Sequence, residues 1–252
     1  MSCICSCGVL APILVNVASR ARVRRGKLCA VEPTRVETRV ARAFLELDWK
    51  ANTQPLHQVI DEIRASNPNG VADIASEWLV CTLAERDAGA ASDALAAGGD
   101  TPFRDLPTDR SFVEGLIARM RKEDNKARSA FIAARAEEEK IVQAQPNFGP
   151  PWCVLGLIDA SLGRKKEALR EGRRAVDLHP VEKDALRRPV MIEHLAMIAA
   201  WVGDNDLACE QLAVAVRPPS DVSYGELKLL PYWDPLRGDP RFEQIVASLA
   251  PK

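Results

Sequence analysis

The chain has few aromatic residues and almost no net charge, and each shortage argues against a class of protein. Phenylalanine, tryptophan and tyrosine make up only 5% of the 252 residues, and the formal net charge is −1. A nucleic-acid-binding domain normally carries a strongly basic patch or stripe, so we expect no nucleic-acid partner. The apolar residues are mainly alanine, leucine, valine and isoleucine. Such small aliphatic side chains favour close helix packing over a sheet core.

The sequence also lacks the motifs of common nucleotide-dependent and metal-dependent enzymes. It contains no glycine-rich kinase loop, His-Arg-Asp, Asp-Phe-Gly, P-loop or His-Glu-x-x-His motif. Of the three histidines, His179 precedes Pro180 and is expected at the C-terminal end of a helix, where the dipole favours it. His57 and His194 are expected in helices with no cysteine or carboxylate cluster nearby. We therefore predict no catalytic residues and no enzyme activity.

The cysteines do not resemble a disulfide framework, because their number is odd. The last three lie singly in apolar helical patterns and are expected to be small core residues in a reducing compartment. The first three alternate with other residues, whereas zinc sites commonly use two cysteines separated by two residues. We therefore predict no metal site and no cofactor. The seven are Cys3, Cys5, Cys7, Cys29, Cys81, Cys153 and Cys209.

Residues 1–36 differ in composition from the rest of the chain. An apolar run at 8–18 is too short to span a bilayer, which needs about 20 residues. Basic residues follow this run, whereas a secretory signal places them before it. A signal peptide or a reverse-oriented anchor stays open as an alternative. We predict a disordered or poorly structured leader and a cytoplasmic protein.

The most informative pattern lies between Trp152 and Pro180. Its spacing matches the tetratricopeptide repeat, a helix-turn-helix unit of about 34 residues. Asp159 stands where tyrosine is usual and Gly172 where an aromatic residue is usual, so we expect looser packing between the two helices of this unit. The matching positions are Trp152, Leu155, Gly156, Ala168, Ala175 and Pro180.

Four weaker units extend this pattern in both directions, with starts 35 to 41 residues apart. Gly163 and Gly203 supply tight turns in the last two units. The long steps have visible causes, because the second helix of the third unit continues to Pro146 and residues 181–188 form an insertion. Residues 98–107 are expected to form a loop. The starts lie near Glu37, Ala72, Thr108, Gly149 and Pro189.

The C-terminal region contains two Asp-Pro pairs, Asp234-Pro235 and Asp239-Pro240. Aspartate is a preferred N-cap and proline suits the first helical position, so each pair predicts the start of a helix. The last helix is expected at 240–249, with an apolar stripe on one face. A repeat array must cover its last apolar face, so this helix is the candidate cap.

The repeats and the Trp-Asp-Pro-Leu-Arg-Gly-Asp-Pro-Arg-Phe segment at 233–242 resemble the C-terminal tetratricopeptide region of bacterial multidomain signalling proteins. In such proteins a serine/threonine kinase, an adenylate-cyclase-like domain or a winged-helix domain precedes the repeats. The resemblance implies an all-α, right-handed superhelical solenoid of antiparallel helix pairs with a C-terminal capping helix. It divides the chain into the leader at 1–36, about five units at 37–220 and the cap at 221–252.

The resemblance also implies a non-enzymatic scaffold that binds a protein or peptide in a concave groove, without metal or membrane. The groove lacks the basic clamp that some such proteins use for a terminal carboxylate. Phe112 and Trp201 are expected either to anchor a partner or to pack against adjacent helices. Two alternatives stay open: a regulatory fragment of a serine/threonine kinase-type protein, and an enzyme acting at the concave face. The predicted groove residues are Phe112, Leu116, Arg119, Cys153, Leu157, Met197 and Trp201.

Overall fold

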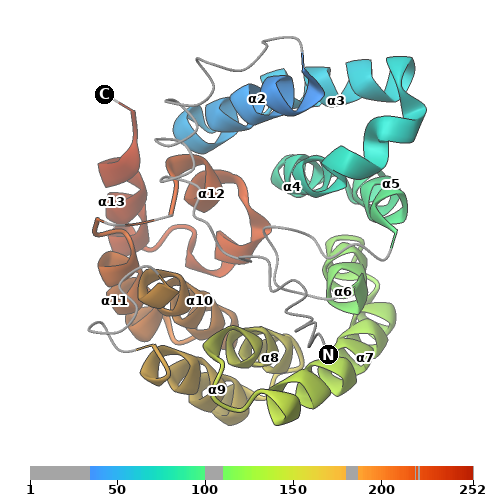
Figure 1. The fold of residues 1–252 in the computed structure, drawn as a ribbon. Coiled ribbons are helices and arrows are strands. Elements are labelled where there is room, and N and C mark those ends of the chain that lie inside the picture. Colours follow the sequence, from blue (N-terminus) through green and yellow to red (C-terminus); the bar gives the residue numbers. More distant parts are fainter. Residues whose placement is uncertain (1–34, 100–109, 180–186, 219, 221, 252) are drawn as a thin grey trace, which may run out of the picture.

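The computed structural model describes residues 35–99, 110–179, 187–218, 220 and 222–251. The regular structure of these residues is helical and includes no strand, which confirms the predicted all-α class (Figure 1). None of the described helices combines the length and the apolar character of a membrane span. The predicted leader, the loop at 98–107 and the insertion at 181–188 fall largely outside the described residues.

Ten of the described helices form five helical hairpins. The predicted glycine turns are confirmed, because Gly163 and Gly203 adopt positive φ angles of 78° and 81°. The other three hairpins turn at a non-glycine residue with positive φ: Ala51, Arg86 or Lys122. The pairs are α2 (Val36–Lys50) with α3 (Gln54–Ser66), α4 (Ala75–Glu85) with α5 (Ala88–Gly98), α6 (Arg110–Met120) with α7 (Asp124–Ala144), α8 (Gly149–Ser161) with α9 (Lys165–Asp177), and α10 (Arg187–Val202) with α11 (Asn205–Ala215).

Neighbouring hairpins pack side by side, and the short helix η1 (Pro68–Ile74) connects the first hairpin to the second. The expected loosening between α8 and α9 is wrong, because a Cβ atom at Gly156 of α8 would lie only 3.1 Å from the Ala168 carbonyl oxygen and 3.4 Å from the Gly172 amide nitrogen of α9. Gly172 instead affects the packing on the next hairpin. A Cβ atom at this position would lie 2.9 Å from side-chain carbons of both Leu195 and Ile198 in α10. The missing side chain therefore lets the fifth hairpin approach the fourth closely.

Asp159 does not loosen the fourth hairpin either, because it makes specific contacts. Its side chain is fully buried and accepts a hydrogen bond of 2.6 Å from Nε of Arg135 in α7. Arg164, in the turn after α8, lies 3.4 Å away. Burial and the neighbouring Asp159 raise the pKa of Glu171 to about 8. A buried carboxylate needs cationic partners, and Arg135 and Arg164 supply them for Asp159. Their contacts therefore join α7, α8 and α9.

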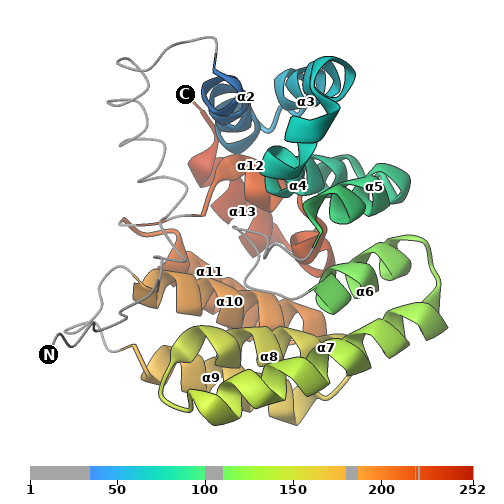
Figure 2. The same cartoon turned by 45° about the vertical axis from the view of Figure 1, so that its right-hand side comes forward.

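The last described helices return into the interior of the arc that the hairpins form (Figures 1 and 2). They are α12 (Tyr224–Leu229), the short helix η2 (Pro231–Leu236) and α13 (Pro240–Leu249). We call residues 222–251 the C-terminal segment. α13 packs on α11, as expected of a cap, while α12 packs on α2 and α4, and η2 packs on α10. The segment therefore joins the last hairpin to the first.

The contact between α12 and α2 is very close. A Cβ atom at Gly225 would overlap the carbonyl oxygen of Leu47 and would lie 2.7 Å from its carbonyl carbon. Ser223 caps α12 by accepting a hydrogen bond from the amide of Glu226, and its hydroxyl donates to Asp48 at 3.2 Å. Only glycine permits this approach of the two backbones.

The two Asp-Pro pairs behave differently. Asp239 accepts a hydrogen bond from the amide of Arg241 and caps α13 at the predicted residue. The prediction is wrong for the other pair, because Pro235 lies inside η2 and that helix begins at Pro231. The Asp234 side chain instead binds arginines, including Arg86 at 2.6 Å.

Candidate functional site

A pocket of about 580 Å³ lies between the concave side of the hairpins and η2. The helices α6, α8 and α10 all end at this pocket. The C-terminal segment forms the opposite wall. The lining residues are Arg86, Leu116, Arg119, Met120, Ala160, Ser161, Gly163, Trp201, Pro231, Tyr232, Asp234 and Pro235.

Arg119 is the main charged group of this pocket. Its guanidinium lies 4.9 Å from the centre of the Phe131 ring and 5.1 Å from the Trp201 ring, so both aromatic faces stabilise the cation. It donates a hydrogen bond of 3.2 Å to the carbonyl of Ser161, the last residue of α8. Among the described residues no carboxylate forms an ion pair with Arg119. Burial lowers its pKa, and the weaker attraction of the nearby Asp124 acts in the opposite direction. The side chain therefore presents a partly desolvated cation to the pocket.

Trp201 forms an adjacent wall and holds η2 in place. Its indole Nε1 donates a hydrogen bond of 2.7 Å to the carbonyl of Tyr232. Its ring lies nearly parallel to Phe112, with a centroid separation of 6.3 Å, and 6.1 Å from the Tyr232 ring. The position of η2 thus depends on a side chain of α10.

Arg86 fixes the other edge of the pocket. This residue ends α4 with φ at 61°, and its side chain reaches the C-terminal segment. Nη1 donates to the carbonyl of Leu229 at 2.6 Å, and Nη2 contacts Asp234 at 2.6 Å. Asp234 also contacts Arg237 at 3.0 Å, so one carboxylate lies between two guanidinium groups.

A pair of acidic side chains lies where α12 meets α10. Glu226 hydrogen-bonds with Glu193, and Trp233 Nε1 donates to Glu226 at 3.3 Å. Burial raises the pKa of Glu226. A protonated carboxyl group can share a hydrogen bond with a neighbouring carboxylate, so this pair holds the segment without repulsion when one of the two groups carries a proton.

The structure brings three of the seven predicted groove residues to the pocket: Leu116, Arg119 and Trp201. Phe112 is 1% exposed and packs edge-on against Phe131. Of its two predicted roles, the described conformation therefore shows packing against adjacent helices. The other three, Cys153, Leu157 and Met197, are buried and do not line the pocket. The C-terminal segment occupies much of the expected concave face, which the local repeat pattern could not reveal. The ligand-binding role of these residues stays a prediction.

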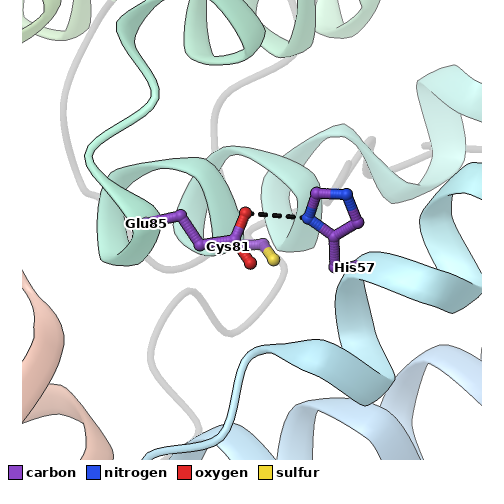
Figure 3. Close-up of side chains that lie close together, drawn as sticks. All are labelled: His57, Cys81 and Glu85. Atoms are coloured by element: carbon purple, nitrogen blue, oxygen red, sulfur yellow. Dashed lines mark hydrogen bonds and ion pairs between the residues drawn. The ribbon is translucent and has the colours of Figure 1, made fainter.

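The expectation that no cysteine or carboxylate lies near His57 is wrong. Nδ1 of His57 lies 2.8 Å from Glu85 (Figure 3). Nε2 lies 3.2 Å from Asp61. The hydrogen bond with Glu85 raises the pKa of His57. Cys81 belongs to the same cluster, in which donor atoms of His57, Cys81 and Glu85 lie within 4.8 Å of one another.

The signal for this cluster is present in the sequence. His57 and Asp61 are four residues apart, as are Cys81 and Glu85, and this spacing places each pair on one helix face. The other two histidines differ. His194 is bonded through Nδ1 to the carbonyl of Val190 at 2.7 Å, and burial lowers its pKa. His179 is buried directly after α9.

The three cysteines within the described residues, Cys81, Cys153 and Cys209, are free and buried, as predicted. No protein-family model matches the chain, and a search of curated proteins finds no relative. The tetratricopeptide relationship therefore stays a prediction from the repeat pattern.

Proposed function

We propose that this chain is a non-enzymatic protein-interaction scaffold of the tetratricopeptide type, acting in bacterial signalling or regulation. It receives an acidic side chain of a partner protein in the pocket beside η2. The observation that carries the proposal is Arg119, a cation in a 580 Å³ pocket with no ion pair among the described residues.

A carboxylate is the natural complement of this guanidinium. Arginine stays charged and can bind a carboxylate through two parallel hydrogen bonds. In the free protein the ring faces of Phe131 and Trp201 and the Ser161 carbonyl compensate the cation only in part. An incoming acidic group supplies the missing charge, while the rings supply apolar contact area. Arginine and tryptophan are also the residue types that commonly dominate binding energy at protein interfaces.

The proposal is tested by panning a displayed peptide library against the full-length chain. Dissociation constants of the selected peptides are then measured for wild type, Arg119→Gln and Arg128→Gln. Arg128 is an exposed arginine of α7 and is the matched control. A hydrogen-bonded charged pair contributes about 1.5–3 kcal/mol, so Arg119→Gln is expected to weaken binding by roughly 10-fold to 150-fold. Arg128→Gln should leave the constants unchanged.

Two further comparisons separate binding in the pocket from a general electrostatic attraction between chain and peptide. Replacing the acidic residue of a selected peptide by its amide should remove the difference between wild type and Arg119→Gln. Trp201→Phe keeps the ring but loses the hydrogen bond to Tyr232, and it should weaken binding of the acidic and the amide peptide alike. Selected peptides that bind Arg119→Gln as tightly as wild type contradict the proposal.

A further inference from the structure

A cluster of four metal-ligating side chains lies outside the pocket, between the first and second hairpins. Two come from α3, His57 and Asp61, and two come from α4, Cys81 and Glu85. Each pair is spaced by four residues and so lies on one face of its helix. The two faces meet, because Nδ1 of His57 lies 2.8 Å from the carboxylate of Glu85. Thiol, imidazole and carboxylate donors therefore meet at one point (Figure 3).

The distances suit a tetrahedral ion. Bonds of about 2.0–2.3 Å from zinc to nitrogen, oxygen and sulfur place neighbouring ligand atoms roughly 3.3–3.8 Å apart. Donor atoms of His57, Cys81 and Glu85 all lie within 4.8 Å of one another, so small side-chain movements bring them to one ion.

His57 is also oriented as a metal-binding histidine usually is. In such sites one ring nitrogen binds the ion and the other donates to a carboxylate, which fixes the ring and its tautomer. Here Nδ1 faces Glu85 at 2.8 Å, and Nε2 lies 3.2 Å from Asp61. Asp61 in turn contacts Arg64 at 3.3 Å. Asp61 is therefore the carboxylate that orients the His57 ring, and His57, Cys81 and Glu85 remain as the three direct ligands.

We propose that His57, Cys81 and Glu85 bind a Zn²⁺ ion that links α3 to α4, with Asp61 orienting the His57 ring. The donor set selects the metal, since Ca²⁺ and Mg²⁺ take oxygen ligands, whereas thiolate and imidazole suit zinc. The Cys81 sulfur is buried, while the His57 side chain is about half exposed, so the ion enters from the His57 side. Binding replaces the thiol proton, which passes to water, and a water molecule completes the tetrahedron.

The test uses Co²⁺ as a spectroscopic substitute for Zn²⁺ in the reduced full-length chain. Cys3, Cys5, Cys7 and Cys29 are replaced by serine in this background, so that a thiolate signal can arise only from the three remaining cysteines. We expect one equivalent of Co²⁺ to produce a thiolate-to-metal charge-transfer band and the visible bands of a tetrahedral ion. One equivalent of Zn²⁺ should remove both.

Two cysteine variants locate the site. Cys81→Ala is expected to abolish the charge-transfer band. Cys209→Ala is the matched control, because Cys209 is also free and buried and has the carboxylates of Asp206 and Asp239 nearby. The control should keep the band at full intensity. The proposal is overturned if the four-serine parent chain gives no band, if Cys81→Ala in that chain keeps it, or if Cys209→Ala loses it.

Variants of the α3 side chains keep the test decisive even if Cys81→Ala does not fold. The His57 and Asp61 side chains are both about half exposed, so their substitution spares the core. Asp61→Asn should weaken Co²⁺ binding by roughly 10-fold to 100-fold, as is typical of a supporting carboxylate, and His57→Gln should weaken it more. Unchanged Co²⁺ affinity in His57→Gln refutes the site.

Discussion

The closest backbone contact of the C-terminal segment gives a quantitative prediction. In Gly225→Ala the new Cβ overlaps the carbonyl oxygen of Leu47 and lies 2.7 Å from its carbonyl carbon. Two carbons pack at about 3.5 Å or more, so α12 must move by about 0.8 Å or more. The opposing atoms belong to the helix backbone, which cannot rotate away as a side chain could. The substitution therefore separates α12 from α2.

The energy follows from two opposing effects. Overpacking a well-filled site costs about 1–3 kcal/mol, and the rigid neighbours here favour the upper end of that range. Alanine gains about 1 kcal/mol over glycine inside a helix. We expect Gly225→Ala to lower the free energy of unfolding by about 2 kcal/mol, which urea denaturation measures. Limited trypsin digestion should also cleave faster after Lys228 and Arg237, because both follow the displaced contact.

The control is Gly89→Ala, the same change at an exposed helical glycine. Its Cβ would lie 3.2 Å from the Asp87 carboxylate, a side chain that can move. Its free energy of unfolding should equal that of wild type or exceed it by up to about 1 kcal/mol, because alanine favours the helix, and digestion should be unchanged. If Gly225→Ala unfolds at the wild-type urea concentration and resists trypsin equally, the close approach of α12 to α2 does not hold the segment in place.

Two further predictions concern the acidic groups buried between α7, α8 and α9. The pKa of Glu171 is about 8 in the folded chain and 4.5 in the unfolded chain, so the folded chain binds this proton more tightly. The protonated side chain therefore contributes its full stabilisation below pH 4.5, and that contribution is lost as the pH rises through 8. Urea denaturation from pH 5 to 8 should show unfolding free energies that fall by up to about 1.4 kcal/mol per pH unit, and Glu171→Gln should flatten this slope. Arg135→Gln leaves the buried Asp159 with Arg164 as its remaining cationic partner among the described residues, and thermal and urea unfolding should show a loss of about 3 kcal/mol. Arg128→Gln, an exposed change in the same helix, should cost less than about 0.5 kcal/mol, and an equal loss in both variants contradicts the ion-pair explanation.

Local signals in the sequence predict the helices well. The last helix lies at the predicted residues, and Asp239 caps it, because an N-cap depends only on its nearest neighbours along the chain. Gly163 and Gly203 mark two turns for the same reason. The turn at Arg86 has no glycine, although the repeat period predicts a turn at Arg86 and Asp87 and Asp87 caps the following helix. There the energetic cost of a left-handed arginine is offset by contacts with Leu229 and Asp234, more than 140 residues away in sequence.

The metal cluster was predictable in part. The spacing of His57 with Asp61, and of Cys81 with Glu85, places two ligating side chains on one face of each helix. That spacing does not reveal that the two faces meet, since this depends on how α3 packs against α4 through η1. Each histidine and cysteine considered singly therefore resembles an ordinary helix residue.

The pocket depends on a contact that repeat periodicity cannot encode. A period of about 34 residues reports which faces of neighbouring helices pack, and it predicts a concave face open along its length. The glycine at position 225 lets α12 reach α2, and η2 then packs on α10 and faces the ends of α6 and α8 across the pocket. Arg119 and Trp201 line the cavity because they lie at or near the last turn of α6 and α10, where the helix ends face η2 across the pocket. The position of the C-terminal segment, more than the repeats themselves, thus determines which concave residues can meet a ligand.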